Sequence, residues 1–76
     1  MGEKNCTITL IDMGPNKVKA IKVLREMFNL GLKEANDIAN YTPYTFQDKY
    51  SIDFANALET QLTQVGVTVK LELGEE

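Results

Sequence analysis

The sequence contains no histidine and no tryptophan, and its only cysteine is Cys6. Without histidine the chain lacks the commonest general base, the Ser–His and Cys–His nucleophile pairs, and any zinc site built on imidazole. A single cysteine cannot form an internal disulfide, and its presence is typical of a reducing compartment. These absences argue against an enzyme, and they predict a protein without catalytic residues, cofactor or bound metal.

Long apolar runs are also missing. No run is long enough to cross a bilayer, and the N-terminus has no signal-peptide pattern. The sequence therefore predicts a cytoplasmic protein with no membrane contact. Its 76 residues, with an apolar fraction of 43% and a charged fraction of 25%, are typical of a small globular unit. We expect one domain over residues 1–76, with its core over about residues 6–73.

Charge is unevenly distributed along the chain. The net charge is −3, yet residues 15–33 carry +4 and the remainder carries −7. The cations of this basic segment are Lys17, Lys19, Lys22, Arg25 and Lys33. A basic segment on an acidic body predicts steering of an acidic protein partner, whereas nucleic-acid-binding proteins are more often basic overall. We expect no direct nucleic-acid binding. The alternative is that these cations are only the solvated face of a helix.

Hydrophobic periodicity predicts an α+β fold of order β-α-α-β-α-β. The expected strands cover residues 6–11, 44–46 and 67–73. The expected helices cover residues 17–28, 32–39 and 52–64. Ser51 is the expected N-cap of the third helix, Gly66 is expected to end that helix, and Gly31 is expected in a left-handed conformation between the first two. Because each long strand has one apolar face, we predict a two-layer sandwich, a three-stranded antiparallel sheet with three helices on one face.

The first predicted helix carries two apolar stripes. The stripe expected to face the core consists of Ala20, Val23, Leu24 and Met27. The second stripe consists of Val18, Ile21, Lys22 and Arg25. It lies roughly 160° around the helix from the first, so both cannot face one sheet. Either Val18 and Ile21 pack under a neighbouring element, or they form an apolar patch among Lys17, Lys22 and Arg25. Such a patch is typical of a transient protein-binding surface. A further alternative is that Ile21, at the border of the first stripe, belongs to the core, and that Val18 is a single exposed apolar residue.

Two runs in this region carry a family resemblance. The pattern Lys17-Val18-x-x-Ile21-Lys22-x-x-Arg25, followed by Gly31-Leu32-Lys33-Glu34-Ala35, resembles the C-terminal domain of the bacterial large-subunit ribosomal stalk protein, the seven/twelve family. Weaker similarity extends from about Thr7 to Leu73. The resemblance implies the same β-α-α-β-α-β architecture. It also implies that the domain captures translational GTPases, namely elongation factors Tu and G and the initiation and release factors.

The resemblance also implies a binding site on the first two helices. The residues that match the family's factor-binding positions are Lys17, Val18, Ile21, Lys22 and Arg25. We add Lys33, from the same basic segment, to complete the expected partner-binding set. The outward stripe and the family's binding positions therefore converge on the first helix.

The chain departs from the family pattern in ways that leave a second function open. Asn36 stands where the family usually has another lysine, and no counterpart of the family's N-terminal dimerisation segment and hinge precedes the first strand. The chain is therefore expected to be either an excised domain or a stand-alone relative. The second case predicts an adaptor or inhibitor, for example a phage or accessory protein, that binds another target. A weak homodimer is the alternative to a monomer.

Aromatic residues gather between the second and third predicted helices and at the start of the third. They are Tyr41, Tyr44, Phe46, Tyr50 and Phe54. The simpler interpretation is that they cover the edge of the small core and fix the connection between the helices. The alternative is a second binding surface peculiar to this protein.

Overall fold

Four strands and three helices make up residues 4–74, the part of the chain that the computed structural model describes. In chain order they are β1 (Lys4–Asp12), α1 (Lys17–Phe28), α2 (Leu32–Asn40), β2 (Tyr44–Thr45), β3 (Tyr50–Ser51), α3 (Ile52–Gln64) and β4 (Thr68–Leu73). The α+β class and the three helices are confirmed, with α2 ending one residue later than expected.

Strand β1 is the centre of an antiparallel sheet. Strand β4 pairs with one side of β1, and β2 and β3 pair with successive parts of its other side. Thr9 of β1 therefore lies between Thr45 of β2 and Lys70 of β4. The prediction of three strands was wrong, because β3 adds a fourth. A two-residue strand is too short to show the alternation by which strands are recognised in a sequence.

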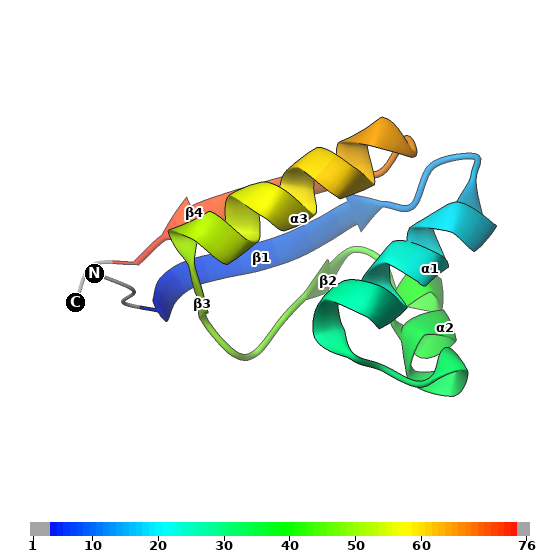
Figure 1. Ribbon diagram of the computed structural model, residues 1–76, viewed down its shortest axis with the longest axis horizontal. Coiled ribbons are helices and arrows are strands. Elements are labelled where there is room, and N and C mark those ends of the chain that lie inside the picture. The colour runs from blue at the N-terminus through cyan, green and yellow to red at the C-terminus, as the bar shows by residue number, and fades with distance from the viewer. Residues whose placement is uncertain (1–3, 75–76) are drawn as a thin grey trace.

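All three helices lie on one face of the sheet (Figure 1). Helix α3 packs directly on β1 and β4, while α1 packs against both α2 and α3. Side chains alternate along β1, so that Cys6, Ile8 and Leu10 are fully buried while the intervening threonines are only half-buried. Helix α1 therefore has two neighbouring helices, a condition that shapes its exposed surface.

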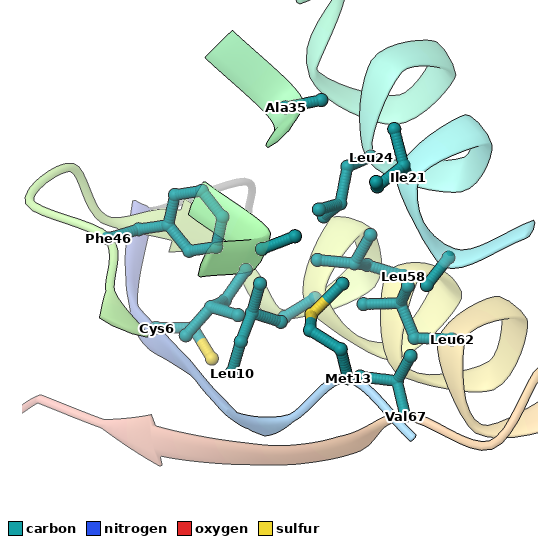
Figure 2. Packing of buried hydrophobic residues seen from close by; sticks show 14 residues of the cluster. Cys6, Leu10, Met13, Ile21, Leu24, Ala35, Phe46, Leu58, Leu62 and Val67 are labelled. Atoms are coloured by element: carbon teal, nitrogen blue, oxygen red, sulfur yellow. The ribbon is translucent and has the colours of Figure 1, made fainter. Parts of the chain in front are cut away.

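The core is a single apolar cluster between the sheet and the helices. Figure 2 shows Leu10, Met13, Leu58, Leu62 and Val67 gathered where β1, α3 and the start of β4 meet. No polar or charged side chain is buried in the part of the chain that the structure describes. Burying one such aliphatic side chain contributes about 1.5–3 kcal/mol, so this cluster is the main source of stability.

The helix ends agree with the sequence in two places and differ in a third. The Ser51 hydroxyl accepts a hydrogen bond from the Phe54 N–H at 3.2 Å, which confirms the N-cap of α3. Helix α3 ends two residues before Gly66, whose φ is +90°. Between α1 and α2, however, Asn29 adopts the left-handed conformation (φ 57°), and Gly31 is extended. Asn29 directly follows the last residue of α1, where the left-handed cap is needed, and asparagine tolerates that conformation.

Two turns meet at the end of the sheet where β1 leads into α1. Gly14 has a φ of +74°, and its N–H donates a hydrogen bond to a carboxylate oxygen of Asp12 at 2.7 Å. A Cβ atom at Gly14 would collide with the carbonyl group of Gly66, in the turn between α3 and β4. Glycine is therefore required at position 14 by backbone conformation and by space together.

We predict that Gly14→Ala lowers the free energy of unfolding by about 2 kcal/mol or more, since it adds backbone strain to a steric collision. Gly31→Ala is the matched control, because Gly31 has a negative φ and the nearest atom to an added Cβ is 3.9 Å away. The control should cost less than about 1 kcal/mol. Urea denaturation followed by circular dichroism measures both. Equal losses in the two variants would contradict the proposed collision.

The thiol of Cys6 is fully buried on β1, as expected for a small apolar residue. Burial raises its pKa above the ordinary value of 9.0. The folded protein therefore holds the proton more tightly than the unfolded chain does. As the pH rises past 9.0, ionisation of the unfolded chain increasingly favours unfolding.

We predict that the free energy of unfolding falls as the pH rises above 9.0, and that Cys6→Ala shows a smaller fall over the same range. Urea titrations of both proteins at a series of alkaline pH values measure the difference. Identical pH profiles for parent and variant would show that Cys6 ionisation is not linked to folding.

Candidate protein-binding groove on helices α1 and α2

A groove of about 370 Å³ lies on the surface shared by α1 and α2. Its lining residues are Val18, Ile21, Lys22 and Arg25 of α1 together with Leu32 and Asn36 of α2. Three of the six are apolar and two are cations. A concave apolar surface bordered by charge can bind a protruding side chain or a short helix of another protein.

The link between the two helices creates this groove. Asn29 ends α1 in the left-handed conformation, and its N–H donates to the Arg25 carbonyl. Gly31 then starts α2, and its N–H donates to the Glu34 carboxylate at 3.1 Å. This short link brings α2 back against α1, so that Leu32 comes to lie beside the outward stripe of α1.

The apolar residues of the groove differ sharply in exposure. Val18 is 80% exposed and Leu32 is 54% exposed, whereas Ile21 is only 8% exposed. Val18 and Leu32 therefore form accessible walls, and Ile21 forms a floor that is largely covered. Large apolar side chains this exposed gain from being covered by a partner.

The burial of Ile21 corrects one sequence-based expectation. The family resemblance favoured a patch in which Val18 and Ile21 are both exposed, but the structure has the alternative arrangement, with Ile21 in the core and Val18 exposed alone. Helix α1 packs against α2 as well as α3, so it buries a wider arc than contact with a single layer would require. Figure 2 shows Ile21 beside Leu24 in the core cluster. Ile21 supports the groove from below, and Val18 remains its exposed apolar residue on α1.

The predicted cations separate into two groups. Lys22 and Arg25 are exposed and line the groove, and neither forms a salt bridge within residues 4–74. Lys17 and Lys33 are not among the lining residues: the Lys17 ammonium lies 3.5 Å from the Asn40 side-chain oxygen, and the Lys33 ammonium lies 3.3 Å from an Asp37 carboxylate oxygen. Of the four, Lys22 and Arg25 are therefore best placed to meet an acidic partner.

Sequence reasoning did not place Leu32 in the site. It treated Leu32 only as part of a matching motif, although a leucine at the first position of a short helix is often exposed. Asn36, where the resemblance led us to expect a lysine, also lines the groove. It supplies an amide instead of a charge, so the two cations of the groove are both on α1.

The aromatic residues form a ring cluster that includes one member the sequence did not suggest. Phe28, at the end of α1, stacks on Phe46 with centroids 4.5 Å apart, and it also contacts the rings of Tyr50 and Phe54. Phe46 is buried, whereas Tyr41 is 70% exposed and belongs to no ring pair among the described residues. The rings largely cover one another, which favours a role at the edge of the core.

Two further features bear on the class of protein. Residues 4–74 contain no group of three or more histidine, cysteine, aspartate or glutamate side chains placed to hold a metal ion. Over the same residues, no helix combines the length and apolarity that crossing a membrane requires.

Comparison with known proteins identifies the family. Residues 6–72 match the family described as "Ribosomal protein L7/L12 C-terminal domain". The chain is 43% identical over 65 residues to the large ribosomal subunit protein bL12 of Francisella tularensis subsp. novicida, covering 86% of this chain and 52% of that protein. It is 40% identical to bL12 of Chloroflexus aggregans over 65 residues, covering 86% and 49% of the two chains.

A third relative has a similar identity and coverage. For bL12 of Brevibacillus brevis the identity is 39% over 66 residues, covering 87% of this chain and 55% of that protein. The chain therefore spans about half the length of the curated relatives it matches. The family match over residues 6–72 contains both helices of the groove, β2 and β3, and most of β1 and β4. The chain belongs to the family of the ribosomal protein L7/L12 C-terminal domain.

Proposed function

We propose that this domain is a non-catalytic binding module of the cytoplasmic translation machinery, and that it recruits translational GTPases through the groove on α1 and α2. The partners are elongation factors Tu and G and the initiation and release factors. The observation that carries the proposal is the exposure of Val18 and Leu32 beside two cations without salt-bridge partners in the described chain. Membership of a ribosomal stalk family supports the same conclusion.

The groove divides recognition between two kinds of contact. Lys22 and Arg25 attract an acidic segment of the factor, which raises the rate of encounter. Val18 and Leu32 then lose their contact with water when an apolar side chain of the factor enters the groove. A site of this size supports weak binding with rapid release, as a delivery role requires.

The competing function, a stand-alone adaptor acting through the aromatic residues, has less support. Phe28, Phe46, Tyr50 and Phe54 contact one another, so little of their surface remains for a partner. Tyr41 is the exposed exception, at 70%, and it stands apart from these ring pairs. The groove is therefore the better binding surface.

We predict that Lys22→Glu weakens binding to elongation factor G about tenfold, because it reverses a charge at the groove. Lys19→Glu is the matched control: Lys19 is an exposed lysine on the same helix but does not line the groove. Affinities are measured by fluorescence anisotropy at low and moderate salt. The parent should bind less tightly at the higher salt concentration, and Lys22→Glu should show a smaller salt dependence.

Equal effects of Lys22→Glu and Lys19→Glu would indicate that only net charge matters, which would contradict specific docking at the groove. A parent affinity that does not change with salt would contradict electrostatic steering.

We predict that Val18→Ser and Leu32→Ser each weaken the same interaction about fivefold or more, while changing the free energy of unfolding by less than about 1 kcal/mol. Both side chains are exposed, so stability and binding separate at these positions. Ile21→Ala is unsuitable as a probe, because truncating a buried isoleucine costs about 2–5 kcal/mol. Calorimetric titration and urea denaturation of each variant give the two quantities. Unchanged affinity in both variants would remove the apolar contact from the proposal.

A further inference from the structure

The outer edge of β4 lies outside the groove on α1 and α2. Strand β4 pairs with β1 on one side, and its other side has no strand partner within residues 4–74. Val69 and Leu71 are half-buried at this edge, and Leu73 is 64% exposed. An unpaired edge with apolar side chains is a template for pairing with another strand.

The pairing of β1 and β4 shows which backbone groups face outward. The Gly74 N–H donates to the Asn5 carbonyl at 2.7 Å, so these two residues form a hydrogen-bonded pair. In an antiparallel ladder such pairs alternate with pairs that do not exchange hydrogen bonds, so Glu72 and Lys70 also bond to β1. On the opposite side of β1, the Ile8 carbonyl accepts from the Phe46 N–H, which agrees with this pattern. The N–H and C=O groups of Val69, Leu71 and Leu73 therefore point to the open edge.

The side chains of β4 are arranged by the same alternation. Leu73, Leu71 and Val69 lie opposite Cys6, Ile8 and Leu10, and so they share the face that the helices cover. Lys70 and Glu72 are on the other face, where their side chains are 60% and 62% exposed. The Lys70 ammonium lies 3.5 Å from the Glu72 carboxylate.

We propose that the β4 edge pairs with the β4 edge of a second copy of this chain, antiparallel and centred on Leu71. With a two-fold axis at Leu71, the outward N–H and C=O groups of Leu71 bond to those of Leu71 in the second copy. Val69 of each copy pairs in the same way with Leu73 of the other. The exposed Leu73 is then covered by a side chain of the second copy on the helix-covered face. On the other face, each Lys70 lies directly opposite the Glu72 of the second copy.

The charges of Lys70 and Glu72 favour this register over the registers shifted by two residues. A shift of two residues in one direction places Lys70 opposite Lys70, and the same shift in the other direction places Glu72 opposite Glu72. Like charges directly opposite each other are destabilising, whereas opposite charges stabilise the pair. Charged residues on an edge usually discourage pairing, but two opposite charges two residues apart allow one self-complementary arrangement. The strand has only six residues, so the dimer is weak and forms at high protein concentration.

The dimer leaves the proposed binding groove accessible. Figure 1 shows α1 and α2 away from β4, with α3 and β1 between them. The inference does not rest on the proposed function, and its test uses residues outside the groove.

Sedimentation velocity from micromolar to millimolar protein tests the proposal with four proteins: the parent, Lys70→Glu, Glu72→Lys, and the double variant with both changes. Each single variant places like charges opposite each other in the centred register and should dimerise about tenfold more weakly than the parent. The double variant exchanges the two charges and should recover the parent's dimerisation. An equimolar mixture of the two single variants should form a heterodimer as stable as the parent dimer, because opposite charges then face each other again.

Circular dichroism confirms that each variant is folded, which is expected because both side chains are exposed. Two results would overturn the proposal. One is a parent that remains monomeric at millimolar concentration, which would leave this edge free for a strand of another protein. The other is a dimer whose stability is the same in all four proteins and in the mixture, which would place the interface elsewhere.

Discussion

The packing of α2 against α1 is the contact on which the candidate site depends. With the two helices packed together, Ile21 is buried at the floor of the groove, and Val18 and Leu32 are exposed at its walls. Without α2, the outward stripe of α1 would be a convex apolar ridge with no concave surface. The left-handed conformation of Asn29 and the short link that follows it set the position of α2. A conformational detail at one residue therefore determines the shape of the binding surface.

The distribution of charge complements this shape. The basic segment contributes Lys22 and Arg25 to the groove, while most of the acidic residues lie elsewhere in the sequence. An acidic partner is thus attracted to one region of a molecule that repels it on average. Asn36 contributes an uncharged amide from α2, so both cations of the groove lie on α1.

The sequence predicted the helices and long strands well, because their periodicity extends over many residues. It failed where structure depends on contacts between elements. Strand β3 is two residues long and is defined by its pairing with β1, in which Tyr50 lies opposite Cys6 and Ser51 opposite Lys4. The position of Leu32 depends on how α2 lies against α1, which the pattern of either helix alone does not contain. The periodicity of α1 allowed Ile21 to be either core or exposed, and packing against neighbouring helices decides between the two. The resemblance to a known family pointed to α1, which lines the groove together with α2, but it could not distinguish the floor of the groove from its walls.

The proposed function depends most on the entry of a partner into the groove between α1 and α2. An NMR titration of isotopically labelled domain with unlabelled elongation factor G tests this most directly. We expect the largest chemical-shift changes at the methyl groups of Val18 and Leu32 and at the amides of the adjacent turns of α1, with small changes at the ring cluster. Changes confined to Tyr41 and the aromatic residues around Tyr44 and Tyr50, with Val18 and Leu32 unaffected, would contradict it.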